Sequence, residues 1–428
     1  MLQDRSSYKL LYSPPVIVAA LGYFVDIYDL LLFSIVRKSS LISLGVPEAE
    51  LFEKGEYLLQ TQMFGMLVGG IIWGIMGDKR GRLSVLFGSI LLYSLANIAN
   101  GFVTTVDQYA ILRFIAGVGL AGELGAGITL VSEILPKHLR GYGTAIVAGV
   151  GVLGAVAGNF VSRSFDSWQV SYFVGGGMGL LLLIARVSVM ESGVFLKVRE
   201  KEEVSRGNFF QLFTNRKRLV KFLGCIFIGL PIWFTIGILV SFSPEFAKAL
   251  SITGTITTGD AVMYSYIGLC VGDLGSGIIS QLIRSRKKVA LTFILMTACL
   301  FVLYLFMPIR TATFFYITCF ALGVSIGYWA LFVTIAAEQF GTNLRSTVAT
   351  TTPNFIRGTV VPLIWLFKLL RDSIKGHYLP ALGENAAYSK GMIYGALIVG
   401  SMTIVIACIA LLPIDETFGR DLNFEEET

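Results

Sequence analysis

The stretch Gly22-Tyr-Phe-Val-Asp26-Ile-Tyr28-Asp29-Leu-Leu-Leu-Phe33 lies inside an apolar run from about Pro15 to Val36. That run is long enough to cross a bilayer as an α-helix. Asp26 and Asp29 are three residues apart, which puts both carboxylates on one face of the helix with Tyr28 beside them. One ionised aspartate at mid-membrane costs about 2.5–3.5 kcal/mol, so the pair needs a polar cavity or partners. One interpretation is structural, with each acid paired to a basic residue; we favour a binding site for a proton, a substrate or both.

The composition is that of a membrane protein with many spans. Of the 428 residues, 54% are hydrophobic and only 14% are charged, and the mean hydropathy is +0.73. So few charges would not keep a soluble chain of this size in solution. Apolar runs predict an all-α protein with twelve transmembrane helices, at about 16–36, 57–76, 84–103, 108–131, 142–163, 169–190, 220–246, 261–282, 289–308, 312–335, 347–369 and 391–412.

The chain divides into two halves of six spans. We expect an N-terminal bundle over 1–190, a cytoplasmic linker over 191–219, a C-terminal bundle over 220–412 and a tail over 413–428. Twelve spans put both termini on the same side, and most of the 34 Lys and Arg fall on that side. The positive-inside rule then predicts cytoplasmic termini in a bacterial-type inner membrane, with the first span retained rather than cleaved as a signal peptide.

An internal repeat supports this division. Glu133 and Arg140 follow the fourth span seven positions apart, and Glu338 and Arg345 follow the tenth span with the same spacing. A parallel repeat of two six-helix halves places a substrate path between the halves near the midplane.

The loop Gly74-Ile-Met-Gly-Asp78-Lys-Arg-Gly-Arg82 resembles the signature between helices 2 and 3 of the major facilitator superfamily, G-x-x-x-D-[RK]-x-G-R, at every fixed position. Glu133–Gly141 matches E-x-x-P-x-x-x-R-G, and Arg113–Glu123 is similar to the fourth helix of its proton-coupled metabolite and phosphate symporters. The tail from Glu416 to Leu422 resembles that of the sugar-porter branch. The resemblance covers the whole chain and implies the major facilitator fold with alternating access.

The same resemblance assigns a cytoplasmic gate. It implies that these charged side chains hold the inner side shut, a role that plain positive-inside topology would not require: Asp78, Arg82, Glu133, Arg140, Glu338 and Arg345. The second half carries Gln281 where the signature has Asp, so the gate is expected to be asymmetric. The fifth span lacks the Gly-Pro pair usual in drug exporters, which argues against an antiporter.

Further charged residues lie within the spans. Glu123, halfway along the fourth span, matches the carboxylate of that helix in proton symporters and joins Asp26 and Asp29 as a candidate for proton coupling. Arg113, nearer the outer end, could pair with an acid there and is expected to be structural or gating. Asp273 in the eighth span is expected in a gate ion pair.

Arg357 lies near the middle of the eleventh span, where an arginine is rare and is paired or faces a polar cavity. Its planar fork fits a substrate carboxylate or phosphate. The alternative is a salt bridge to Asp26 or Asp29, and both hold if substrate displaces the acid. The remaining predicted substrate-binding residues are Asn354, Tyr28, Trp233, Tyr328 and Trp329, although packing or lipid contact explains such aromatics equally well.

The five cysteines lie within spans of the second half without ligand spacing, and neither histidine belongs to a metal pattern. We therefore expect no metal, cofactor, nucleic-acid partner or enzymatic activity, and a chain that works as a monomer.

The sequence favours proton-driven uptake of a small, anionic organic metabolite. Three alternatives stay open. A neutral sugar or polyol symporter would use Arg357 structurally; a proton antiporter would export its substrate; and a transporter-like sensor would show no flux.

Overall fold

The computed structural model describes residues 9–80, 82–123, 135, 140–191 and 209–418. Within this part of the chain all regular elements are helical. The first half contains α2 (Pro14–Ser43), α3 (Leu51–Arg80), α4 (Arg82–Asn100), α5 (Val106–Leu120), α7 (Arg140–Ser164) and α8 (Trp168–Glu191). The predicted linker falls mostly outside the described residues; only a short helix, α10 (Gln211–Thr214), precedes the second half.

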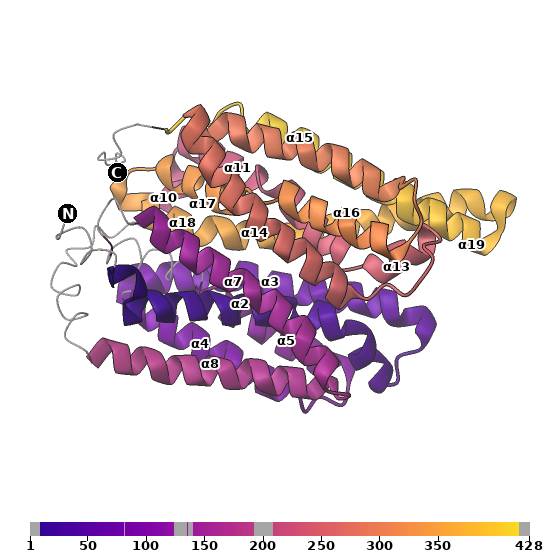
Figure 1. Ribbon diagram of the computed structural model, residues 1–428, viewed down its shortest axis with the longest axis horizontal. Helices are drawn as coiled ribbons and strands as arrows, with labels where there is room; N and C mark the ends of the chain where they lie inside the picture. The colour runs from indigo at the N-terminus through magenta and orange to yellow at the C-terminus, as the bar shows by residue number, and fades with distance from the viewer. Residues whose placement is uncertain (1–8, 81, 124–134, 136–139, 192–208, 419–428) are drawn as a thin grey trace.

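The spans of the second half are more often interrupted than those of the first. Its elements are α11 (Arg216–Phe227), α12 (Leu230–Phe234), a π-helical segment (Thr235–Val240), α13 (Ser243–Ala249), α14 (Thr258–Ile283), α15 (Arg286–Leu305), α16 (Ala312–Ser325), α17 (Trp329–Glu338), α18 (Thr342–Gly358) and α19 (Val360–Ala410). Figure 1 shows the first half, indigo to magenta, gathered below the second half, salmon to yellow.

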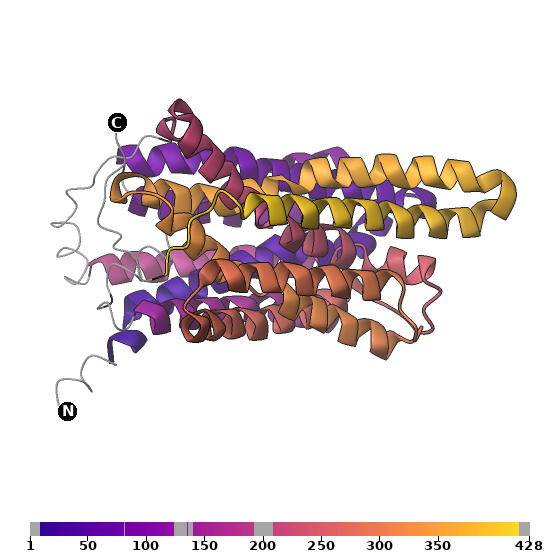
Figure 2. The ribbon, with the colours of Figure 1, turned by 90° about the horizontal axis from the view of Figure 1, so that it is seen from above.

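These elements make twelve spans. Eight helical stretches among the described residues are long and apolar enough to cross a membrane. One of them, Thr347–Ala410, contains two spans because the chain reverses at Gly383. The other three spans are α4, α5 and α7, of which α5 leads into undescribed residues. The chain enters α2 and leaves α19 at the same end of the molecule (Figures 1 and 2).

Many helices extend beyond their predicted ends, and one predicted loop is wrong. Residues 370–390 are not an outer loop but two helical arms of α19 joined at Gly383, whose φ of 75° favours glycine. Ion pairs between Lys375 and Glu384 (2.5 Å) and between Arg371 and Asp372 (2.9 Å) lie along this polar hairpin. Figure 2 shows the hairpin projecting past the other helices at the end opposite the termini.

The most extensive contacts between the halves are those of α3 with α18 and of α7 with α14. At the first contact Gly70 has no side chain, and a Cβ there would lie 2.7 Å from Cβ of Asn354. The Asn354 amide donates a 2.7 Å hydrogen bond to the carbonyl of Ala121 in the other half. Small residues and side-chain amides thus replace the hydrophobic effect, which does not drive helices together in lipid.

Candidate functional site

The centre of the molecule holds an ion pair between the halves. The Arg357 guanidinium, near the end of α18, lies 3.7 Å from Oδ2 of Asp26, in the middle of α2. The two side chains are 1% and 0% exposed. Neither Asp26 oxygen, and neither Nε nor Nη1 of Arg357, makes a hydrogen bond to a described residue. The pair is therefore buried with most of its hydrogen-bonding capacity unused.

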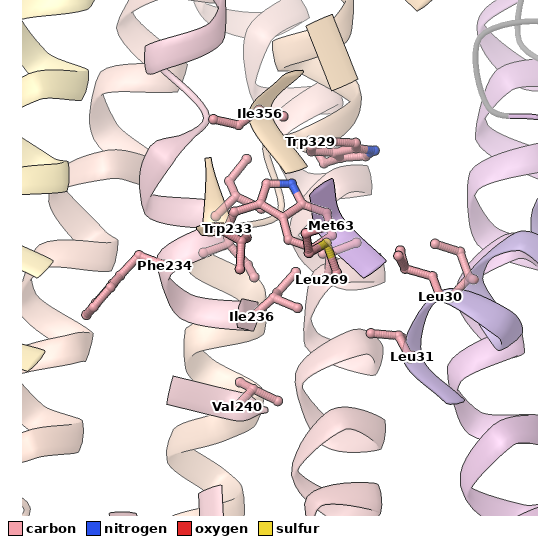
Figure 3. Packing of buried hydrophobic residues seen from close by; sticks show 14 of the residues in the cluster. Leu30, Leu31, Met63, Trp233, Phe234, Ile236, Val240, Leu269, Trp329 and Ile356 are labelled. Atoms are coloured by element: carbon pink, nitrogen blue, oxygen red, sulfur yellow. The ribbon is translucent and has the colours of Figure 1, made fainter. Parts of the chain in front are cut away.

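Two tryptophans of the second half enclose this guanidinium. The Arg357 Cζ lies 5.7 Å from the ring centroids of both Trp233 and Trp329, within the range of a cation–π contact. The two rings meet edge to face at 6.2 Å. Figure 3 shows them within the buried apolar cluster, together with Met63 from α3 and Leu269 from α14. The arrangement combines one cation with flat apolar walls.

The helices that carry these residues are interrupted at this depth. Trp233 precedes the π-helical segment of its span, Trp329 is the first residue of α17, and Arg357 precedes the change from α18 to α19. π-Helical turns are frequent at functional sites. Broken backbone at membrane depth is tolerated only where protein or a cavity buries it.

The two aspartates of α2 face different neighbours. Asp29 packs against α8, where a Cβ on Gly175 would collide with its carboxylate. Both Asp29 oxygens are buried and accept no hydrogen bond from the described residues. Arg357 is thus paired with Asp26 and not with Asp29, although both acids lie on the same helix.

Glu123 forms an ion pair with Arg186 of α8, which also donates a 3.2 Å hydrogen bond from Nη1 to Oε2. A Cβ on Gly22 would collide with both side chains, so the pair lies against α2 one turn before Asp26. The sequence alone assigned no role to Arg186. The position of this arginine within an apolar run could have indicated a buried partner.

The tyrosine hydroxyls predicted at the substrate site bind backbone carbonyls instead. Tyr28 donates to Ser171 (2.8 Å) within the first half, and Tyr328 donates to Ile228 (2.9 Å) within the second. Their hydroxyls are therefore structural in this conformation.

Arg113 is fully buried, and its side-chain hydrogen bonds go to amides. It donates to the amide oxygens of Asn97 (2.6 Å) and Asn100 (3.2 Å). Its guanidinium also lies 4.7 Å from the ring of Tyr172. Two amides and an aromatic face therefore surround the Arg113 guanidinium.

Most residues of the predicted cytoplasmic gate lie outside the described part of the chain. The side chains of Asp78, Arg82, Glu133, Arg140 and Arg345 are not among those described. Glu338 is described and forms a 2.7 Å ion pair with Arg286, at the start of α15 in its own half.

Sequence reasoning missed a set of ion pairs between the halves near the end that bears the α19 hairpin. Arg37 of α2 binds both Glu245 oxygens, at 2.7 and 2.9 Å. Arg371 binds Glu56 at 2.9 Å. Further pairs there are Lys368 with Glu53 and Arg163 with Asp260. The sequence shows these charges at the ends of apolar runs, but it does not show which of them pair.

Aromatic rings pack against two of these ion pairs. The rings of Phe52 and Phe242 meet edge to face at 4.9 Å. The Arg37 guanidinium lies over Phe242 and that of Arg371 over Phe52, at 4.8 and 4.5 Å. Together these contacts hold the two halves closed at this end of the molecule. Among the described residues, no group of His, Cys, Asp and Glu is arranged to hold a metal ion.

Known proteins support the same architecture. The chain is 25% identical over 265 residues to the sialic acid transporter NanX of Escherichia coli, covering 59% of this chain and 64% of that protein. It is 33% identical over 149 residues to the 4-hydroxybenzoate transporter PcaK of Pseudomonas putida, covering 34% and 33%. The matched regions span less than two thirds of each relative.

Among solved structures, the fold is similar to the partially occluded, inward-open xylose transporter XylE from E. coli. The TM-score is 0.69 at 15% identity, over 97% of this chain and 100% of that one. A sequence profile of the Major Facilitator Superfamily matches residues 19–353. With twelve spans in two halves around a central buried ion pair, the chain belongs to the Major Facilitator Superfamily and is a membrane transporter, not an enzyme.

Proposed function

We propose that this transporter is a proton-coupled symporter that imports a small organic carboxylate. The observation that carries the proposal is Arg357, held between two tryptophans and bound only loosely to Asp26 at 3.7 Å. Two of its three nitrogens make no hydrogen bond to a described residue. A guanidinium with free donors favours a carboxylate, which it binds through two parallel hydrogen bonds.

Charge balance explains why a proton would travel with the anion. In the empty site Arg357 and Asp26 neutralise each other. When a substrate carboxylate takes the place of Asp26 on Arg357, the released acid is a buried charge without a partner. Taking up a proton removes that cost, so the loaded site is neutral again. Coupling of one proton to one monovalent anion follows, and the transport step moves no net charge.

Flat apolar walls favour a substrate with a ring. Trp233 and Trp329 offer aromatic surface next to the cation. Two relatives are named for sialic acid and 4-hydroxybenzoate, both of which carry a carboxylate on a ring. We therefore assign Arg357 to the carboxylate and the two tryptophans to the ring, with Asn354 joining the halves beside them.

For the proton we assign Asp26 first and Asp29 second. Asp29 is buried and without a hydrogen-bond partner among the described residues, so a proton is the simplest way to satisfy it. Glu123 is occupied by Arg186 and contributes by holding α2 in place.

Two gates complete the cycle. The ion pairs near the α19 hairpin hold that end closed in this conformation, and we place it on the outer side of a bacterial inner membrane with both termini in the cytoplasm. The opposite gate is assigned to Asp78, Arg82, Glu133, Arg140, Glu338 and Arg345.

The test uses purified protein in proteoliposomes with an imposed pH gradient. Benzoate, nicotinate, acetate, phosphate, xylose and a polyol are supplied one at a time, with and without a valinomycin-clamped potential. Uptake of a carboxylate that follows the pH gradient and ignores the potential supports the proposal. Loss of uptake in Arg357→Gln, with partial rescue in Arg357→Lys, supports the assigned role. Uptake of xylose or polyol alone, or efflux alone, would refute it.

A further inference from the structure

We propose that Asp273 of α14 is a positioning residue that fixes Trp329 against Arg357 and thereby sets the preference for ring-bearing substrates. The proposal rests on the function proposed above. Asp273 was expected in a gate ion pair, but no described cation pairs with it. Instead its Oδ1 accepts a 3.0 Å hydrogen bond from the backbone N–H of Ala330, in the first turn of α17.

The acid compensates for a break in the tenth span. The helix stops at Ser325 and restarts at Trp329, so the first N–H groups of α17 have no partner within the helix. Tyr328, at the N-cap position, makes no capping hydrogen bond with its side chain. Unsatisfied amides are costly in a bilayer, and a carboxylate at a helix N-terminus also gains from the helix dipole. Asp273 supplies from a neighbouring helix what α17 lacks.

Glycines bring the two helices close enough for this contact. A Cβ on Gly327 would lie 2.6 Å from the backbone nitrogen of Asp273, and one on Gly272 would lie 2.8 Å from Cα of Gly327. Any side chain at either position would push α14 away from the break. The backbone of α14 therefore passes directly beside it, which leaves Asp273 within reach of the first turn of α17.

The first turn of α17 is also the turn that carries the ring at the site. Trp329 is its first residue, one position before the N–H that Asp273 accepts. Its ring meets Trp233 at 6.2 Å and lies 5.7 Å from the Arg357 guanidinium. It also stacks on Phe332, with the ring centroids 5.4 Å apart. A change in where α17 begins would move this ring relative to the cation.

A second contact ties the same break to the seventh span. The Tyr328 hydroxyl donates to the carbonyl of Ile228, which lies between α11 and α12 where that helix is itself interrupted. Trp233 follows on α12. Asp273 and Tyr328 thus satisfy one backbone group at each break. The two tryptophans lie on α17 and α12, the segments that follow these breaks.

The experiment compares Asp273→Ala, which removes the acceptor, with Asp273→Asn, which keeps a carbonyl oxygen in its place. Ser280→Ala is the matched control, because among the described residues this buried hydroxyl on α14 bonds only the carbonyl of Gly277 in its own helix. The first readout is ¹⁹F NMR of protein labelled with 5-fluorotryptophan, whose five resonances are assigned by single Trp→Phe replacements.

We expect Asp273→Ala to shift or broaden the Trp329 resonance, Asp273→Asn to do so less, and Ser280→Ala to leave it unchanged. The three tryptophans that do not contact Arg357 act as internal references for folding: Trp73, Trp168 and Trp365. An unmoved Trp329 resonance in folded Asp273→Ala would overturn the proposal, whatever the substrate proves to be.

The second readout is the ratio of uptake efficiencies for benzoate and acetate in proteoliposomes. Asp273→Ala should lower this ratio about 10-fold, the size of a lost wall contact in an apolar pocket. Because Asp273 acts through Trp329, adding Asp273→Ala to Trp329→Ala should lower the ratio no further. An additive effect would refute the positioning role. Transport of neither acid by the wild type would refute the proposed function, while the NMR result still decides the role of Asp273.

Discussion

The central ion pair gives the sharpest test of the site, through stability rather than transport. At 3.7 Å, Arg357 and Asp26 attract each other by about 4.5 kcal/mol if the effective dielectric constant is about 20. Replacing Asp26 by Asn leaves a buried guanidinium that cannot lose its proton, so the variant should lose about 3–5 kcal/mol of unfolding free energy. Arg357→Gln should cost less, because a lone buried carboxyl group can neutralise itself by taking up a proton.

The double variant distinguishes pairing from general packing. Asp26→Asn combined with Arg357→Gln removes both charges and should unfold within about 1 kcal/mol of the wild type, because a neutral pair replaces the ion pair. The double variant should therefore have a higher unfolding free energy than Asp26→Asn, although it carries one more substitution. The matched control is Asp29→Asn, one turn further along α2, where no ion pair with a described residue is lost.

The assay is thermal unfolding in detergent, followed by tryptophan fluorescence at one protein concentration. At about 2 °C per kcal/mol for a chain of this size, Asp26→Asn should lower Tm by roughly 6–10 °C, with most of the loss regained in the double variant. Additive losses in the double variant, or an Asp26→Asn protein as stable as the wild type, would refute the pairing and the charge balance built on it.

Three further results are expected. Glu245→Gln should weaken the outer contact with Arg37 and so open the outer side more often. In a background without other cysteines, an impermeant maleimide should then label Ser34→Cys about 10-fold faster, and unchanged labelling would mean that this pair does not close the outer side. Glu416 lies beyond the last helix. Burial raises its pKa, but the hydrogen bonds that it accepts from the start of α15 together lower the pKa by more, so the net pKa is below the ordinary value. Its stabilising contribution is therefore present above the ordinary carboxyl pKa of about 4.3 and is lost as pH falls through the folded pKa. Because solvent screens this exposed side chain, Glu416→Gln should cost no more than about 1 kcal/mol at pH 7, and a Tm difference that does not narrow in acid would contradict this. Gly154→Ala would drive a Cβ into a backbone carbonyl of α2 and should lower the unfolding free energy by about 1–3 kcal/mol, whereas unchanged stability would mean that these helices can separate freely.

The fold was largely predictable, because spans of about 20 apolar residues are the strongest signal in a membrane sequence. The ends were not. Helices such as α2 and α3 continue past the apolar run into turns that water can solvate, where hydropathy no longer distinguishes helix from loop. The α19 hairpin is the extreme case, since its polar residues 370–390 are helical almost throughout.

The charged residues at the site could be found from the sequence, but their partners could not. Asp26, Asp29 and Arg357 attract attention because a charge at mid-membrane is costly. Residues three apart on a helix point about 60° from each other, so the rotation of α2 decides which acid meets Arg357. Arg37 and Glu245 are 208 residues apart, and only the docking of the halves brings them together.

The distribution of ion pairs suggests an order of events for the proposed cycle. Some of the outer pairs include exposed side chains, such as Lys368 with Glu53, which are 37% and 63% exposed. Water can solvate such charges when the halves separate, so breaking exposed pairs costs at most about 1 kcal/mol each. The central pair has no such replacement, because both side chains are buried between the halves. Separating Arg357 from Asp26 without compensation would leave two lone charges in the membrane, at several kcal/mol. A carboxylate bound to Arg357 and a proton bound to Asp26 remove both costs at once. In this cycle the exposed outer pairs separate at little cost, whereas separating the central pair requires substrate and proton to arrive together.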